Sequence, residues 1–150
     1  MQLLSLGSQY VITALVLLSK EERGKVIPAS ELARPLKSPG TYLSQMLAKL
    51  IKPGIIASRR GLNGGVYLAR DPKEISLYDI VVAIEGDEFF SSCFLGINGC
   101  GDIEPCPFHE EWSLKKESIR SWLESTSLHD LKEQATNDWV TDRIETDQPV

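Results

Sequence analysis

The chain has no long hydrophobic run and very little cysteine. Its 150 residues include only three cysteines and two histidines. The most apolar run, from Tyr10 to Ser19, is too short to span a bilayer, and no basic segment followed by a small-residue cleavage site marks a signal peptide. An odd number of cysteines argues against a closed disulfide framework. We therefore expect a cytoplasmic protein with no membrane partner.

Acidic residues are missing from the middle of the N-terminal half. The net charge of the chain is −5. Residues 1–75 carry eleven Lys and Arg against five Asp and Glu, a net charge of +6, whereas residues 76–150 carry five against sixteen, a net charge of −11. No acidic residue lies between Glu31 and Asp71, although seven basic ones do. An acid-free basic segment in an acidic protein is typical of phosphate binding.

The order of the elements expected in the N-terminal half is that of a winged helix-turn-helix. Hydrophobic periodicity predicts helices from about Ser8 to Ser19, from Ala29 to Leu36 and from about Thr41 to Ile51. Two β-rich runs flank the sequence GLNGG at 61–65 and predict a hairpin whose glycines shape the turn. In this arrangement the second helix of the motif enters the major groove of DNA.

The helix predicted over 41–51 has one apolar and one polar face. Its apolar stripe consists of Leu43, Met46, Leu47 and Leu50. On the polar face, Gln45 can pair with adenine, and Lys49 suits a phosphate. Arg60, in the hairpin, suits a narrow minor groove. The side chains that we expect to contact DNA are Ser38, Thr41, Tyr42, Gln45, Lys49, Arg59, Arg60 and Asn63.

The C-terminal half is also predicted to be mainly helical. A helix over Ser76–Glu85 begins with a capping box, and a second helix start is expected at Ser127. Between them lie a Gly-rich loop over about 86–107 and a long helix over Glu110–Glu124. The side chains of the long helix expected to point inward are Trp112, Ile119, Trp122 and Leu123.

All three cysteines and one histidine lie in that loop. The pattern is Cys93-x6-Cys100-x5-Cys106-x2-His109. Structural zinc prefers ligand pairs roughly two to four residues apart. The wider, glycine-filled gaps here suit a larger group, and thiolates together with an imidazole hold iron–sulfur clusters. Zinc binding and redox thiols with one cysteine left over stay open as alternatives.

Two stretches of the chain closely resemble a known family. Residues 42–70, YLSQMLAKLIKPGIIASRRGLNGGVYLAR, and residues 75–86, ISLYDIVVAIEG, resemble the winged-helix regulators of the IscR and NsrR type, the Rrf2 family. The resemblance implies a homodimeric bacterial transcription factor, commonly a repressor, that binds a double-stranded DNA operator. It also implies that Thr41, Tyr42, Gln45 and Arg60 contact that operator.

The resemblance extends to the cysteine loop. Family members that bind a cluster carry three cysteines there, and this chain has one residue more in the first gap. A histidine three positions after the last cysteine implies a [2Fe-2S] cluster held by Cys93, Cys100, Cys106 and His109. Relatives that sense nitric oxide hold a [4Fe-4S] cluster with a carboxylate from the first helix, and the first acidic residue here is Glu21. We therefore favour [2Fe-2S], with [4Fe-4S] as the alternative.

These patterns divide the chain into three expected regions. Residues 1–86 form a winged helix-turn-helix DNA-binding domain, residues 87–109 a cysteine-rich cluster-binding loop, and residues 110–150 a dimerisation helix and tail. No nucleophile motif, phosphate-binding loop or pair of catalytic carboxylates is recognisable, so we expect no enzyme. The expected function is transcriptional regulation in response to redox, nitric oxide or iron–sulfur status. A family member that senses thiol oxidation, zinc or a small metabolite is the alternative.

Overall fold

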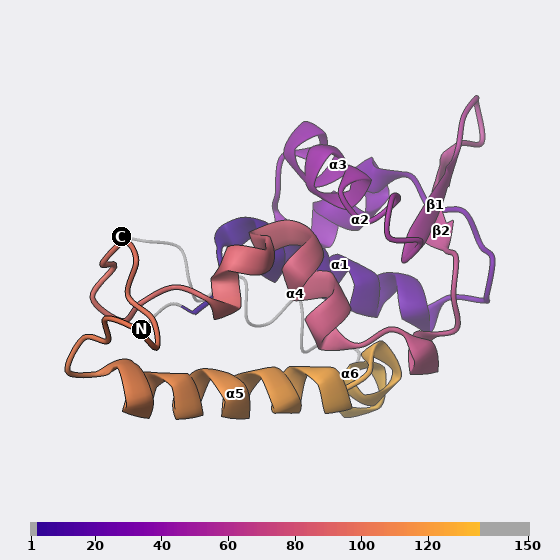
Figure 1. Cartoon of the computed structure of the whole chain (residues 1–150). Coiled ribbons are helices and arrows are strands. Elements are labelled where there is room, and N and C mark those ends of the chain that lie inside the picture. Colours follow the sequence, from indigo (N-terminus) through magenta and orange to yellow (C-terminus); the bar gives the residue numbers. More distant parts are fainter. Residues whose placement is uncertain (1–2, 136–150) are drawn as a thin grey trace.

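The order of helices and strands is that of a winged helix-turn-helix protein. A computed structural model of the chain describes residues 3–135, and over these residues it is mainly helical, with one two-stranded sheet. The α-helices are α1 (Leu6–Lys20), α2 (Ala29–Leu36), α3 (Gly40–Ala48), α4 (Leu77–Glu85), α5 (His109–Ser125) and α6 (Leu128–Gln134). The strands are β1 (Ile56–Arg59) and β2 (Gly65–Leu68), and two short 3-10 helices are η1 (Pro72–Glu74) and η2 (Asp87–Phe90). Figure 1 shows the arrangement, which confirms the predicted fold class.

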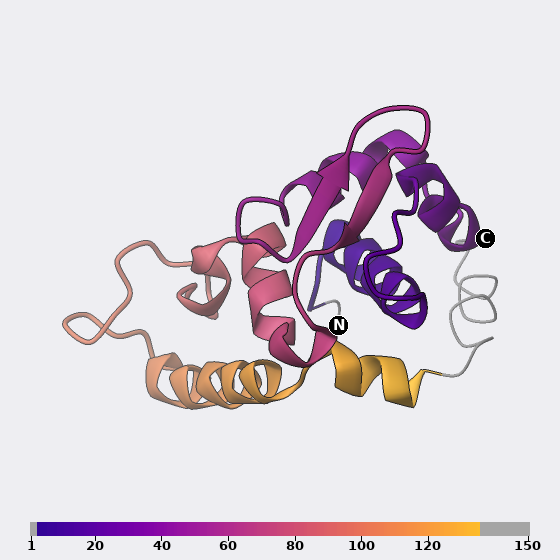
Figure 2. The ribbon, with the colours of Figure 1, turned by 90° about the vertical axis from the view of Figure 1, so that its right-hand side faces the viewer.

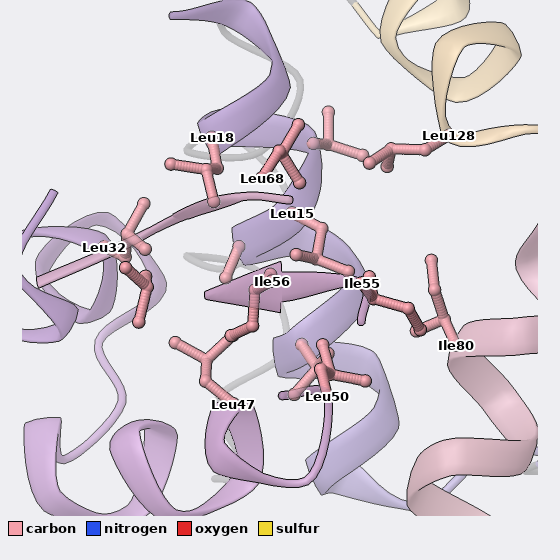
Figure 3. Close-up of a cluster of buried hydrophobic side chains, with 14 of the residues drawn as sticks. Leu15, Leu18, Leu32, Leu47, Leu50, Ile55, Ile56, Leu68, Ile80 and Leu128 are labelled. Carbon is pink, nitrogen blue, oxygen red and sulfur yellow. The ribbon is translucent and has the colours of Figure 1, made fainter. Parts of the chain in front are cut away.

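Helix α1 is the centre of the core. It packs against α2, α3, α4 and α6, and Val11, Ala14 and Leu15 are completely buried. Figure 3 shows Leu15 within a cluster of leucine and isoleucine side chains contributed by several helices and by the hairpin. The helix predicted from about Ser8 to Ser19 is thus confirmed; it is apolar nearly all round, and its burial joins the two halves of the described chain.

Helices α2 and α3 form the helix-turn-helix. Helix α2 ends where Lys37 adopts a left-handed backbone conformation, with φ of 51°. Helix α3 ends at Ala48 rather than at the predicted Ile51. The backbone N–H groups of residues 49–51 bond to carbonyls three residues back. Because Pro53 cannot continue a helix and disfavours helical geometry just before it, the chain leaves α3 through tight turns.

The wing is an antiparallel hairpin held against the start of α2. Ile56 lies opposite Leu68 in the register of β1 and β2. Val66 also forms a bridge to Ile27, in which each backbone N–H donates to the other's carbonyl at 2.9 Å. A Cβ atom at Gly65 would lie 2.4 Å from both the carbonyl carbon and the carbonyl oxygen of Ile27. The bridge therefore requires glycine at that position.

Two capping boxes fix where α4 and α6 begin. The Ser76 side chain accepts a hydrogen bond from the Asp79 backbone N–H at 3.0 Å, and Ser127 and Asp130 repeat the pattern at 3.1 Å. Both helix starts were predicted. The two caps also pair with each other through a β-bridge between Ser76 and Ser127. The chain thus returns, after the cysteine loop and α5, to the point where α4 began.

A carboxylate at the end of α4 binds the start of α1. Glu85 Oε1 accepts hydrogen bonds from the Ser5 backbone N–H at 2.8 Å and from the Ser8 hydroxyl at 2.6 Å. Burial raises the pKa of Glu85, but the hydrogen bonds from Ser8 and Ser5, together with the charge of Lys49, lower it more. The net pKa lies below the ordinary value, so the bonds favour the ionised carboxylate.

Helix α5 runs along the edge of the molecule opposite the hairpin (Figures 1 and 2). It contacts α4 and η2, burying Leu123 and partly burying Trp112 and Ile119. Trp122 was also predicted to point inward, but it is 57% exposed. A helix that lies on one layer of structure buries a single stripe, and Trp122 lies beside that stripe rather than in it.

Two further predictions concern the C-terminal tail and the absence of a membrane span. The C-terminal end of the region expected over 110–150 as a dimerisation helix and tail lies outside the described residues, which end at residue 135. Among residues 3–135, no helix is both long and apolar enough to cross a membrane. The predicted loop after α4 begins with a feature that periodicity did not indicate, the 3-10 turn η2.

Replacing Gly65 with alanine should destabilise the fold. The added Cβ atom would clash with the Ile27 backbone, so we expect the free energy of unfolding to fall by about 1–3 kcal/mol. Urea denaturation followed by circular dichroism measures this change. Gly101→Ala is the matched control, because a Cβ atom there meets nothing within 4 Å. Equal stability of the two variants would contradict the proposed steric role.

Candidate functional site

The polar face of α3 is exposed on the side of the molecule that also carries the hairpin tip. Thr41, Gln45 and Lys49 are exposed, whereas Leu43 and Leu47 on the opposite face are completely buried. The two-faced helix predicted from the sequence is thus confirmed. Figures 1 and 2 show α3 and the hairpin at the same end, away from α5.

The other side chains predicted to contact DNA differ in exposure. Arg59, Arg60 and Asn63, in the hairpin, are exposed, whereas Ser38 and Tyr42 are half-buried. The ring of Tyr42 packs edge-to-face on Tyr10 of α1, with the ring centroids 6.1 Å apart. This packing limits how far the Tyr42 side chain can reach outward and gives it a second role in holding α3 on α1.

A glycine of α1 sets how closely α3 approaches. A Cβ atom at Gly7 would lie 2.9 Å from Met46 Sδ and 3.1 Å from the Tyr42 hydroxyl oxygen. Sequence reasoning did not single out Gly7, because a glycine in a helix gives no sign of which neighbour packs on it. It is a positioning residue for the polar face of α3.

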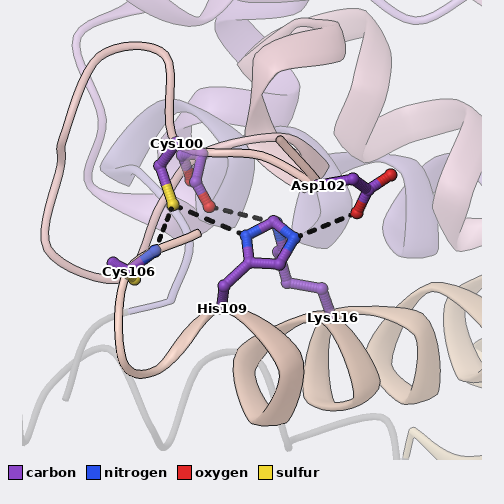
Figure 4. Close-up of polar contacts among 6 residues, drawn as sticks. Cys100, Asp102, Cys106, His109 and Lys116 are labelled. Atoms are coloured by element: carbon purple, nitrogen blue, oxygen red, sulfur yellow. Dashed lines mark hydrogen bonds and ion pairs between the residues drawn. The ribbon is translucent and has the colours of Figure 1, made fainter. Parts of the chain in front are cut away.

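The predicted cysteine loop brings its four candidate ligands together. The sulfur atoms of Cys93, Cys100 and Cys106 all lie within 4.8 Å of one another, and those of Cys93 and Cys106 are 3.6 Å apart. His109, the first residue of α5, places Nδ1 3.5 Å from the Cys100 sulfur (Figure 4). All four side chains are half-buried. Residues 16 positions apart in sequence thus converge on one centre.

An aspartate lies on the far side of the imidazole. Asp102 Oδ1 is 3.4 Å from His109 Nε2, so Nδ1 faces the cysteines while Nε2 faces a carboxylate. A carboxylate in this place orients a metal-binding histidine and raises its basicity. Asp102 was not predicted, although its position between two candidate ligands was the available signal.

The thiols differ in acidity. The backbone N–H of Ile97, and to a lesser extent that of Leu95, favours the thiolate of Cys93 and lowers its pKa to about 7 from the ordinary 9.0. The Cys106 backbone N–H lowers the pKa of Cys100, but burial and the neighbouring thiols raise it more, so that pKa lies above its ordinary value. Cys93 therefore ionises at a lower pH than Cys100.

This donor set fits a metal centre. Three sulfur atoms within 4.8 Å of one another can bind a common metal ion or cluster, and His109 offers a nitrogen beside them. Thiolate and imidazole ligands together select zinc or iron–sulfur clusters over magnesium or calcium. The geometry accommodates both of these groups, so it narrows the class of metal without choosing between them.

The same combination of fold and site recurs in a known protein family. The Rrf2 family, described as iron-dependent transcriptional regulators, matches residues 4–134 of the chain. The chain belongs to the Rrf2 family of transcriptional regulators. The family predicted from residues 42–70 and 75–86 is thereby confirmed.

Individual Rrf2 relatives support the assignment. The chain is 31% identical to the regulator IscR of Xenorhabdus nematophila over 149 residues, which cover 99% of this chain and 89% of that protein. Among solved structures, IscR of T. potens is 26% identical with a TM-score of 0.70, covering 98% of this chain and 92% of the other. CymR, the global cysteine regulator of B. subtilis, is 26% identical with a TM-score of 0.73, covering 91% of this chain and 100% of the other.

The difference in thiol acidity predicts which cysteine reacts first. In reduced, metal-free protein we expect iodoacetamide to modify Cys93 at a rate that rises through about pH 7, while Cys100, whose pKa is raised, reacts more slowly than Cys93 at neutral pH. Peptide mapping by mass spectrometry measures both rates. Protein unfolded in urea is the control, because there the two thiols should share one pH dependence. Faster modification of Cys100 at neutral pH would contradict the assignment.

Proposed function

We propose that this protein is a homodimeric repressor that binds operator DNA and responds to redox, nitric oxide or iron–sulfur status through an iron–sulfur cluster. The observation that carries the proposal is the convergence of three cysteine sulfur atoms and His109 Nδ1 on one centre, in a family described as iron-dependent. We assign one role to each of three consecutive regions: residues 1–86 bind DNA, residues 87–109 hold the cluster, and residues 110–150 include the dimerisation helix.

The DNA-binding role rests on exposed side chains of α3 and the hairpin. We assign Thr41 and Gln45 to base edges in the major groove and Lys49 to a phosphate. Arg60 lies in the hairpin tip, at a position suited to the minor groove. The acidic residues of the C-terminal half repel DNA and keep the contact on this side.

Helix α5 offers a surface for a second copy of the chain. Leu114 is 63% exposed and Trp122 is 57% exposed. With about 3.6 residues per turn they lie about 80° apart around the helix axis, and Trp122 lies between Leu114 and the buried stripe that holds Ile119 and Leu123. Exposed large apolar side chains on a helix suit a symmetric dimer, and a dimer would present two copies of α3 to two half-sites.

The cysteine centre is suited to a [2Fe-2S] cluster. Cys93, Cys100, Cys106 and His109 would hold it, and Asp102 would orient the His109 ring. Helix α1 contains no acidic residue that could supply the carboxylate of the alternative, a [4Fe-4S] cluster. When bound, either cluster supplies reactivity towards oxidants and nitric oxide.

The loop is connected directly to the proposed dimer helix. His109 is both a candidate ligand and the first residue of α5, so a shift of its ring also shifts the start of that helix. Only about 1.4 kcal/mol of differential affinity is needed for a tenfold change in DNA binding. A displacement of the start of α5 that changes the DNA affinity by this amount of free energy is therefore sufficient for regulation.

A thiol sensor without a cluster is the second candidate. The Cys93 and Cys106 sulfur atoms are 3.6 Å apart, close enough to form a disulfide after a small movement. CymR, the cysteine regulator, has the same fold. This candidate requires a protein that contains neither iron nor sulfide.

Anaerobic purification separates the two candidates. We expect a brown protein with equal iron and acid-labile sulfide, whose ratio per chain distinguishes the two-iron from the four-iron cluster. Cys100→Ala should bleach the visible spectrum, and His109→Ala should shift it. The matched control is His129→Ala, because the chain has only two histidines and His129 lies in α6 beside Glu133. A colourless wild type after reconstitution would reject the cluster.

The DNA interface makes separate predictions for specificity and affinity. After selection of an operator from random duplexes, Gln45→Ala should weaken operator binding by about 1–3 kcal/mol and leave non-specific binding unchanged. Lys49→Ala should weaken binding to all sequences and reduce the salt dependence by about one phosphate contact. Fluorescence anisotropy measures both effects. Lys115→Ala, on α5, should behave as wild type, and equal losses in all three variants would contradict the assigned interface.

A further inference from the structure

Two side chains of α5 bind one backbone carbonyl in the cysteine loop. The indole Nε1 of Trp112 donates to the Ser92 carbonyl oxygen at 2.9 Å. Lys116 Nζ donates to the same oxygen at 3.1 Å, and Figure 4 shows Lys116 beside the cysteine loop. Trp112 and Lys116 are four residues apart, so both project from one side of the helix. Ser92 immediately precedes Cys93. The position of Cys93 is therefore linked to α5 on its N-terminal side.

The residue after Cys93 is held by the same tryptophan. The Phe94 ring centroid lies 5.5 Å from that of Trp112 and 5.6 Å from that of Phe108. Phe108 immediately precedes His109. Aromatic pairs at these distances attract each other beyond their buried area. Trp112 thus contacts both neighbours of Cys93, and the Phe94–Phe108 pair brings the two ends of the loop together.

The middle of the loop has no comparable support. Cys100 is flanked by Gly99 and Gly101, and Gly96 and Gly99 have positive φ values of 70° and 79°. Glycine loses more conformational freedom on ordering than any other residue, so a glycine-rich loop does not by itself hold three thiols together. The Cys100 sulfur accepts a hydrogen bond from the Cys106 backbone N–H and lies within hydrogen-bonding distance of His109 Nδ1, and both of these partners belong to the centre itself.

We propose that Trp112 and Lys116 are positioning residues of the cysteine centre, which hold Cys93 beside Cys106 through the Ser92 carbonyl and the Phe94 ring. The inference rests on the proposed function for the metal-bound form. It also applies to the metal-free chain, in which the Ser92 and Phe94 contacts lie on either side of Cys93 and the Cys93 sulfur lies 3.6 Å from that of Cys106.

Variants that remove one contact at a time test the proposal. Lys116→Met keeps the aliphatic stem and loses the ammonium group, and Trp112→Phe keeps an aromatic ring and loses the N–H donor. Lys115→Met is the matched control, since Lys115 is the adjacent residue of α5 and pairs with Glu111 at 3.2 Å instead. Thermal unfolding by circular dichroism verifies that each variant is folded.

The first readout is anaerobic titration of the metal-free chain with Co²⁺. Thiolate-to-cobalt absorption reports binding without iron or sulfide. We expect Lys116→Met and Trp112→Phe to bind Co²⁺ about tenfold more weakly, the range typical of residues that orient metal ligands. The absorption spectrum should stay that of the wild type, because the ligands are unchanged. Affinities equal to that of Lys115→Met would overturn the proposal.

The second readout needs no metal. Diamide oxidises two thiols to a disulfide: each thiol gives one proton and one electron, a sulfur–sulfur bond forms, and the azo group of diamide is reduced to a hydrazine. We expect the Cys93–Cys106 disulfide to form several-fold more slowly in Lys116→Met and Trp112→Phe than in Lys115→Met. Equal rates, measured by peptide mapping, would overturn the proposal for the metal-free chain.

The two readouts separate this inference from the proposed function. If wild type binds neither cluster nor Co²⁺ but the disulfide rates differ as expected, the cluster proposal fails and the positioning role stands. If wild type binds a cluster and all variants match Lys115→Met in both readouts, the cluster proposal stands and the positioning role fails.

Discussion

The burial of α1 is the constraint on which the rest of the structure depends. Leu6–Lys20 carries one charged residue, and Val11, Ala14 and Leu15 have no exposed surface. A helix that is apolar nearly all round must be covered on every side, and each large aliphatic side chain that it buries stabilises the fold by roughly 1.5–3 kcal/mol. Helices α2 and α3 cover one side, and α4 and α6 cover another. Both halves of the described chain therefore share one core, and neither can move far without uncovering α1.

Polar contacts add specific links between helices to this apolar packing. Glu85 joins the end of α4 to the first turn of α1, where the partial positive charge of the helix terminus favours a carboxylate. The charge of Lys49, at the end of α3, acts on the same carboxylate. Helices α1 and α4 thus meet at one carboxylate whose ionised form the charge of α3's Lys49 also favours, and the residue after Glu85, Gly86, begins the segment that leads to the cysteines.

Local sequence signals predicted the elements well, and contacts between distant residues explain most of what they missed. Helix α2 has its predicted bounds, Ala29–Leu36, because proline and turn residues mark both ends. The capping boxes located α4 and α6 for the same reason. The inward placement of Trp122 was wrong, because hydrophobic periodicity does not tell which apolar face meets the same chain. The convergence of the cysteines with His109 followed from spacing and resemblance, whereas Asp102, Trp112 and Lys116 act across a loop with no periodicity.

The pairing of the two capping boxes has a consequence for how this protein can vary. The bridge between Ser76 and Ser127 joins the residue before α4 to the residue before α6. The segment between them, which contains α4, the cysteine loop and α5, is therefore a closed loop with both ends fixed. Within that segment, the contacts of Trp112 and Phe94 join the residues around Cys93 to α5 and so close the smaller cysteine loop. Lengthening a closed flexible loop costs little, because the entropy of closure grows only with the logarithm of its length. An additional residue between Cys93 and Cys100 can therefore be accommodated in the loop, because the binding of a common ligand constrains the separation of the sulfur atoms in space rather than their spacing along the chain.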